Sequence, residues 1–182
     1  MGFHHVALAT RDLEATHAFY TEAMGFELVK VVVAPTESGQ GWAKHVFYET
    51  PGDGMIAFWD LHDDTLPEFD GAMSTGIGLP AWVNHLAFHA EVDELEGRIE
   101  RWTAHGLDVL EVDHGFCRSI YTLDPNGTMV EWCADTRVLD EEDRKAALAV
   151  LFDPNPELED PPVPVFHKKQ KKVAAAAGAP TA

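Results

Sequence analysis

The amino-acid sequence predicts an α+β fold made of two βαβββ modules. Two stretches share one pattern: HVALATRDLEATHAFYTEAMGFELVKV begins at residue 5, and HLAFHAEVDELEGRIERWTAHGLDVLEV begins at residue 85. Each starts with an alternating strand that opens on histidine, continues through a helix with an acidic start and returns as a second strand. A turn and a further strand follow in both halves. Self-similarity at this period indicates duplication of one unit, with the two half-sheets sharing a core.

The first module covers residues 3–62. Its helix begins near Asp12 and ends at Gly25, because glycine is the residue type that most often stops a helix. The strand FELVKVVV follows, and a glycine-containing turn at 52–54 precedes the strand MIAFWD. This module therefore reads as a strand, a helix and three strands.

The second module covers residues 83–135 and repeats this order. Its helix begins near Asp93 and ends at Gly106, and the strand LDVLEV follows. The Asp-Pro-Asn-Gly turn at 124–127 is a hairpin signal that precedes the strand TMVEWCA. Residues 63–82, which are rich in Gly, Pro and Asp, link the modules. Because this linker is longer than ordinary connections, we expect a lid or a cavity wall.

The two modules and their linker form one expected domain, residues 1–138. Residues 139–166 form a C-terminal extension, with a helix over 140–152 whose first-turn acids suit the helix dipole, and then a proline-rich segment. Residues 167–182 are low in complexity and are expected to form a disordered tail. A chain of 182 residues buries enough surface to fold without a disulfide or a metal ion.

Charge and composition exclude several classes of partner. Asp plus Glu is 31 and Lys plus Arg is 13, for a net charge of −18, and phosphate recognition needs a basic face, so no nucleic-acid partner is expected. No apolar run is long enough to span a bilayer, so no membrane partner is expected either. The start of the chain shows no signal peptide, and Cys117 and Cys133 are expected to be free thiols. These features predict a cytoplasmic protein.

One carboxylate stands in the middle of an otherwise apolar strand. Glu131 lies between Val130 and Trp132, and an unpaired buried carboxylate is costly, so a positive partner is expected. Because alternate residues of a strand share a face, His5 and His85 lie on equivalent small-residue faces of their strands. Two imidazoles and one carboxylate are the ligand set of a facial-triad metal site, which leaves three coordination positions open.

These residues resemble the vicinal oxygen chelate superfamily, which includes glyoxalase I, bleomycin-resistance proteins and type I extradiol catechol dioxygenases. The resemblance covers residues 3 to about 135, and its general signs are HVALATRDLEATHAFYTEAMGFEL and NHLAF. The more specific match is to the extradiol signature, at Val112, His114, Ile120, Tyr121, Asp124, Pro125, Gly127 and Glu131. The resemblance implies the glyoxalase/dioxygenase fold, in which the two modules form a shared half-barrel metal cavity.

The resemblance also implies an extradiol ring-cleaving dioxygenase of aromatic catabolism, with Fe(II) as cofactor and with O₂ and a small aromatic diol as substrates. The iron ligands would be His5, His85 and Glu131. His62, within LHDDTL, matches the segment that bears the acid–base histidine. His114 matches a histidine behind the ligands, and Tyr121 matches the tyrosine that hydrogen-bonds the substrate oxygen. We also expect a homo-oligomer.

Two other functions stay open. A glyoxalase-like lyase or isomerase would use another divalent metal, such as Mn, Ni or Zn, as a Lewis acid, and it usually brings a second carboxylate from the first module. Counted from the turn glycine, Phe58 takes the place that matches Glu131, which favours a three-ligand oxygenase site. Asp60 would restore a carboxylate only through a shift in strand register. A small-molecule-binding resistance protein of the same fold would commonly lack the three ligands.

Overall fold

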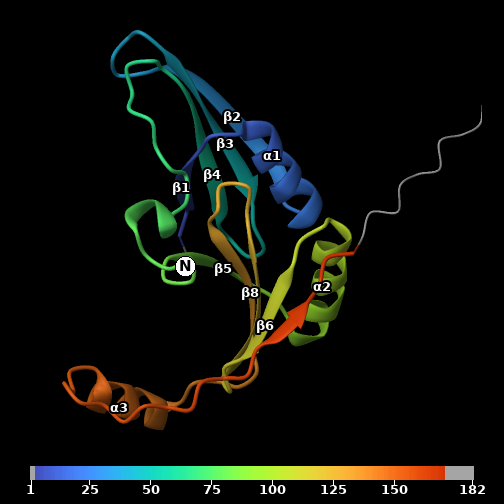
Figure 1. The fold of residues 1–182 in the computed structure, drawn as a ribbon, viewed down its shortest axis with the longest axis vertical. Helices are drawn as coiled ribbons and strands as arrows, with labels where there is room; N and C mark the ends of the chain where they lie inside the picture. Colours follow the sequence, from blue (N-terminus) through green and yellow to red (C-terminus); the bar gives the residue numbers. More distant parts are fainter. Residues whose placement is uncertain (1–2, 171–182) are drawn as a thin grey trace, which may run out of the picture.

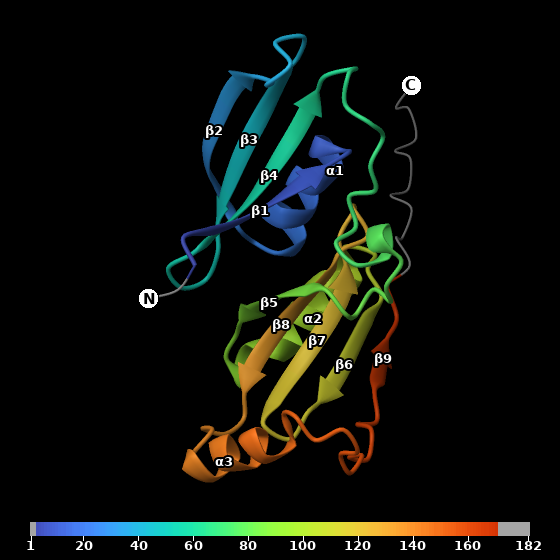
Figure 2. The same ribbon diagram turned by 90° about the vertical axis from the view of Figure 1, so that its left-hand side faces the viewer.

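The computed structural model describes residues 3–170, and Figures 1 and 2 show its two sheets and few helices. The first module contains β1 (His5–Thr10), α1 (Leu13–Ala18), the π-helical turn η1 (Phe19–Ala23), β2 (Glu27–Pro35), β3 (Trp42–Glu49) and β4 (Met55–His62). Its strands form a sheet in the order β1-β4-β3-β2, in which β1 and β4 are parallel. The predicted βαβββ order is confirmed.

The second module repeats the plan of the first. It contains β5 (His85–His89), the short 3-10 helix η3 (Val92–Glu94), α2 (Leu95–Ala104), β6 (Val109–Asp113), β7 (Cys117–Leu123) and β8 (Met129–Asp135). Its sheet has the order β5-β8-β7-β6-β9, where β9 (Val165–His167) comes from the C-terminal segment. The linker contains a single short 3-10 helix, η2 (Thr75–Ile77), within the described residues. The predicted duplication is therefore visible in the topology.

Local signals place the helix ends where the sequence predicts them. The carboxylate of Asp12 caps α1 by accepting a hydrogen bond from the backbone N–H of Ala15 at 2.9 Å. Gly25 and Gly106 follow the helical segments with φ of 81° and 83°. Glycine adopts this left-handed conformation without the steric penalty of a Cβ, so both helices end there.

The two modules share one hydrophobic core on the helix-covered sides of their sheets. The ring centroid of Phe26 lies 5.1 Å from that of Phe88 and 5.8 Å from that of Trp132, both in the other module. The hydroxyl of Tyr20 donates to the carboxylate of Asp124 at 3.1 Å, again across the modules. Figure 1 shows α1 and α2 on the same side of the molecule, where this core lies. The predicted shared core is confirmed.

The Asp-Pro-Asn-Gly turn fastens the second module to the first. The hydroxyl of Thr10 donates to the side-chain oxygen of Asn126 at 2.9 Å, and the Asn126 amide donates to Thr16 at 3.2 Å. The carboxylate of Asp124 accepts the backbone N–H of Thr128 at 2.8 Å, and burial raises the pKa of this carboxyl. These contacts make the turn a structural joint between the modules.

Each sheet has a second face, turned away from the shared core. On β1, the side chains of Val6 and Leu8 point toward the core side and His5 points the other way. We call the His5 side of the first sheet open face A; it carries His5, Ala7, Ala9, His45, Phe47, Ala57 and Trp59. We call the corresponding side of the second sheet open face B; it carries His85, Ala87, Ser119, Tyr121, Glu131 and Cys133.

The C-terminal segment contains α3 (Glu141–Val150), as expected, and then β9. His167 pairs with Val109 in the sheet, and the backbone N–H of Lys169 donates to the carboxylate of Asp108 at 3.0 Å. A disordered tail that starts at residue 167 is therefore wrong for 167–170, because β6 offers a free edge that this segment covers; residues 171–182 lie outside the described part of the chain. Within residues 3–170, no helix is long and apolar enough to cross a membrane.

Candidate metal centre

The buried carboxylate of the second module has a histidine partner. Glu131 lies in the middle of β8 and is 5% exposed. Strands β5 and β8 are parallel neighbours, so residues of open face B on these two strands lie close together. Nε2 of His85 is 2.9 Å from Oε2 of Glu131. The partner that an interior carboxylate requires is therefore the equivalent histidine of the second module.

The other ring nitrogen of His85 determines what this pair can bind. Nδ1 is 2.9 Å from the backbone oxygen of Trp82, which can only accept a hydrogen bond, so Nδ1 carries a proton. Nε2 then carries a lone pair 2.9 Å from a carboxylate oxygen, so the two groups need a proton or a metal ion that both can bind. The donors of the pair thus fit a metal, with the Trp82 carbonyl orienting the ring.

His5, the third predicted ligand, lies on open face A, away from His85. Its Nδ1 is 2.8 Å from Nδ1 of His4, and its ring centroid is 5.4 Å from that of Phe47 and 5.9 Å from that of His45. Within residues 3–170, no three His, Cys, Asp or Glu side chains gather closely enough to hold a metal. One chain therefore does not bring the three predicted ligands together, because its modules pack through their helix-covered sides and leave the open faces as separate surfaces.

The strand register corrects the residue that was matched to Glu131 in the first module by counting from the turn glycine. Ala7 on β1 is opposite Ala57 on β4, just as Ala87 on β5 is opposite Glu131 on β8. The counterpart of Glu131 is therefore Ala57, and Phe58 points into the core, because one residue fewer separates the turn glycine from the strand in the first module. Ala57 has no donor atom, so the first module supplies no carboxylate at this position.

Two further predicted residues lie beside Glu131. Tyr121 of β7 is opposite Glu131 in the register, and its ring centroid is 6.1 Å from that of His85. The Tyr121 hydroxyl is 2.9 Å from Nε2 of His114. Burial raises the pKa of Tyr121, and the charge of Glu131 adds to the rise, so the hydroxyl keeps its proton at neutral pH. The structure thus brings four of the six predicted site residues together at open face B.

His62, the predicted acid–base residue, lies away from both open faces. It ends β4, and its Nε2 is 2.8 Å from the carboxylate of Asp60. Its ring stacks on that of Trp42 with centroids 3.8 Å apart. Strand alternation puts His62 and Asp60 on the side of β4 that carries Phe58, so neither reaches open face A. The acid–base role of His62 stays a prediction.

His45 was not among the site residues predicted from the sequence. It lies near His5 on open face A. Its ring stacks on Trp59 with centroids 3.9 Å apart. Burial, helped by the nearby His5, lowers the pKa of His45, and its buried Nε2 has no hydrogen-bond partner among the described residues. The alternation of His45 and Phe47 along WAKHVFYE is the signal that could have identified it.

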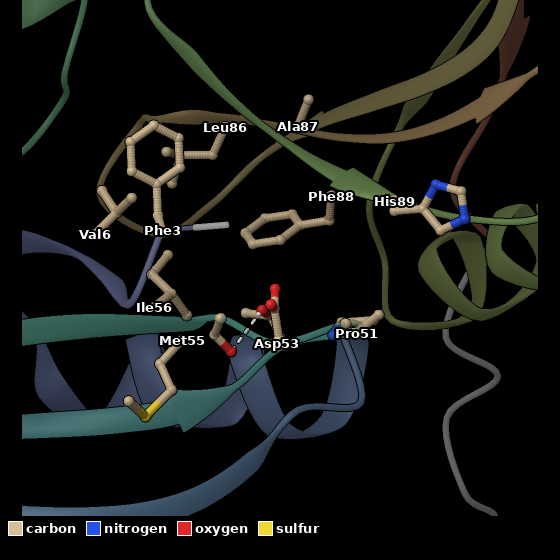
Figure 3. Close-up of a pocket in the computed structure, with 13 residues that line it drawn as sticks. Phe3, Val6, Pro51, Asp53, Met55, Ile56, Leu86, Ala87, Phe88 and His89 are labelled. Carbon is tan, nitrogen blue, oxygen red and sulfur yellow. Dashed lines mark hydrogen bonds between the residues drawn. The ribbon is translucent and has the colours of Figure 1, made fainter. Parts of the chain in front are cut away.

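An apolar pocket of about 370 Å³ opens elsewhere, between the two modules (Figure 3). Val6, Ile56 and Phe88, which help to line it, come from the core-facing sides of β1, β4 and β5. Phe3 and Leu86 complete its apolar wall. Ala87 and His89 of β5 also line the pocket, but His5, His85 and Glu131 do not.

Comparisons with known proteins agree with this architecture. The model of the Glyoxalase/Bleomycin resistance protein/Dioxygenase superfamily matches residues 2–132. No curated protein matches the chain. Among solved structures, the glyoxalase family protein from Enterococcus faecalis is similar with a TM-score of 0.52 and 25% identity, over 71% of this chain and 94% of that chain. A mutant of the fosfomycin resistance protein FosX from Listeria monocytogenes, solved with Mn(II) and 1S,2S-dihydroxypropylphosphonic acid, has a TM-score of 0.51 and 23% identity, over 79% of this chain and 97% of that chain.

Proposed function

The chain belongs to the Glyoxalase/Bleomycin resistance protein/Dioxygenase superfamily, and from this membership we propose that it is a metal-dependent enzyme that cleaves a catechol-type aromatic ring with O₂. One observation supports metal binding. Nε2 of His85 and a carboxylate oxygen of Glu131 lie 2.9 Å apart, while Nδ1 of His85 is hydrogen-bonded to the Trp82 carbonyl, which leaves Nε2 and the carboxylate as two adjacent donors for a metal ion. Imidazole and carboxylate together are ligands for Fe(II), our proposed cofactor, and also for Mn(II) or Zn(II).

We propose that His5 reaches this point from a second copy of the chain. His5 and the His85–Glu131 pair belong to different open faces, and both faces are turned away from the core that joins the modules. When open face A of one copy covers open face B of another, the three donors meet. A dimer with two-fold symmetry then contains two identical sites, each with donors from both chains.

The remaining residues of the two faces suit a small aromatic diol. Three protein ligands would leave room at the metal for both substrates, and Fe(II) held there would supply the activation of O₂ beside a bound diol. The Tyr121 hydroxyl, which keeps its proton, would donate a hydrogen bond to a substrate oxygen, and His114 would hold that hydroxyl in position. Phe47 and Trp59 of open face A would cover the aromatic ring and exclude water.

Oxygen consumption tests this proposal. Protein loaded anaerobically with Fe(II) should take up O₂ when a panel of catechols is added, and a yellow ring-opened product should appear in the absorption spectrum. Glu131→Gln should lose this activity. Glu100→Gln, which makes the same change at an exposed position of α2, should keep it and is the matched control.

Three results would contradict the proposal in different ways. Conversion of a thiol adduct by the Mn(II), Ni(II) or Zn(II) form, without oxygen uptake by the Fe(II) form, would establish the lyase or isomerase function instead. Binding of aromatic ligands without turnover by any metal form would indicate a binding protein. Full activity in Glu131→Gln would show that this carboxylate is not a ligand.

A further inference from the structure

The pocket between the two modules has apolar walls that are only partly covered (Figure 3). The side chains of Val6, Leu86 and Phe88 on these walls are half-buried, and the ring of Phe3 beside them is 83% exposed. The volume of about 370 Å³ lies in the range of sites that hold small organic molecules. A small apolar ligand would therefore bury surface that the described residues leave in contact with solvent.

Asp53 brings a carboxylate to this pocket. It lies on the turn between β3 and β4, across the pocket from Leu86 and Phe88 of β5 (Figure 3). The backbone N–H and the hydroxyl of Thr50 both donate to the backbone oxygen of Gly54, at 3.1 and 2.9 Å, which closes the turn and fixes the position of Asp53. Within residues 3–170, the Asp53 carboxylate has no hydrogen-bond or ion-pair partner, so its charge is available to a ligand.

The other groups around the pocket leave this negative charge uncompensated. Among the described residues that line the pocket there is no lysine and no arginine. The imidazole of His89 is 3.3 Å from a carboxylate oxygen of Glu91, so a proton on His89 is balanced by Glu91. The net charge of the chain, −18, adds a negative field at longer range. The pocket therefore complements a cation and disfavours an anion.

We propose that this pocket binds a small aromatic ammonium compound, an arylalkylamine in its protonated form. The ammonium group pairs with Asp53, and the ring packs against Phe3 and Phe88, since aromatic rings attract both one another and a nearby cation. The proposed metal ligands do not line the pocket, and a simple arylalkylamine has no pair of oxygens with which to chelate a metal. The site is therefore independent of the proposed function.

Titration of the full chain, followed by nuclear magnetic resonance at neutral pH without added metal, tests the site. Phenethylamine should bind with a Kd of about 1 mM or below, as expected for so small a ligand in a well-formed pocket. Phenethyl alcohol, which has the same ring and no charge, should bind at least about threefold more weakly, and the anion hydrocinnamate at least about tenfold more weakly. The amide signals of Met55 and Phe88 should shift, whereas those of His45 and Tyr121 on the open faces should not.

Three variants assign the two contacts. Asp53→Asn should lower the affinity for phenethylamine about three- to tenfold and that for phenethyl alcohol less than about twofold, because only the amine uses the charge. Asp64→Asn makes the same change at an exposed position outside the pocket and should leave both affinities within about twofold of the parent. Phe3→Ala should weaken both ligands at least about threefold, because both pack against the ring. All three positions are exposed, so the variants should fold, and far-ultraviolet circular dichroism checks this.

Four results would overturn the site. They are the absence of saturable binding of phenethylamine up to about 10 mM, equal binding of phenethylamine and hydrocinnamate, shifts confined to the open faces, and an Asp53→Asn variant that binds the amine like the parent. Unchanged binding in Phe3→Ala would contradict the placement of the ring. The oxygen-uptake assay separates this site from the proposed function, because Asp53→Asn should lose amine affinity and keep oxygen uptake with catechols.

Discussion

Open face A and open face B are built by the same duplicated unit, but they carry different chemistry. Each has a histidine at the start of its first strand. Beyond that, Ala57 stands where open face B has Glu131, and Phe47 stands where it has Tyr121. One face therefore offers a carboxylate and a hydroxyl, and the other offers small and aromatic side chains. The difference indicates that neither face is a complete site and that each supplies what the other lacks.

The core-facing sides of the same two sheets, in contrast, carry similar side chains. The counterparts Phe58 and Trp132 are 0% and 1% exposed, and both belong to one shared cluster. Apolar packing is retained on both core sides because each module must bury that side to fold. The sides that pack in the core are alike in character, whereas the faces free of that demand differ.

The largest expected effect is loss of metal from variants of either open face. His5→Ala and Glu131→Ala should each lose bound metal, at least about 100-fold in affinity, because both remove a donor of the composite site. Mixing the two variants after dissociation and reassociation should restore metal to about a quarter of the sites, since half of the dimers are mixed and each has one intact site. Metal analysis of the desalted mixture measures this.

The matched control is a mixture of His85→Ala with Glu131→Ala. Both changes fall on open face B, so a mixed dimer has one lost donor in each of its sites and should not recover metal. Recovery in this control, or none in the first mixture, would contradict a site shared between two copies.

A smaller effect is expected on stability, and it should be similar in the two modules. Phe58→Ala and Trp132→Ala should each lower the free energy of unfolding by about 3–5 kcal/mol, because each leaves a cavity in the shared core. Urea unfolding should show one transition that shifts as a whole in both variants. Trp82→Ala, at a position 66% exposed, is the control and should change stability by less than about 1 kcal/mol. Two separate transitions, each moved by one variant alone, would show that the modules do not share a core.

The smallest expected effect is that of His62→Phe. The resemblance to the extradiol family assigns His62 the acid–base role, and loss of such a group lowers turnover by about 10²–10⁴. Because His62 is hydrogen-bonded to Asp60 on the side of β4 away from open face A, we expect unchanged metal content and a fall in turnover of less than about tenfold. The turnover rate of Fe(II)-loaded His62→Phe, compared with that of the parent, distinguishes the two expectations. A fall in the larger range would establish the acid–base role and require the loop after β4 to move.

Much of the fold follows from local signals in the sequence. The two modules, their order of elements and the helix ends at Gly25 and Gly106 were predicted, because hydrophobic period and glycine conformation act over a few residues. Strand alternation also predicted that His85 and Glu131 would share a face. Their direct contact agrees with the need of a buried carboxylate for a partner.

The tertiary structure decided the remaining features, since they depend on contacts between distant segments. The pairing of β1 with β4 decided that Ala57, and not Phe58, is the counterpart of Glu131, because a shift of one residue reverses every side chain in a strand. The contacts of Phe26 with Trp132 decided which sides of the sheets face each other, and hence that His5 lies on a separate open face. Spacing along the chain determines which residues share one face of a strand. It does not determine what packs against that face, because this depends on contacts between side chains far apart in the sequence.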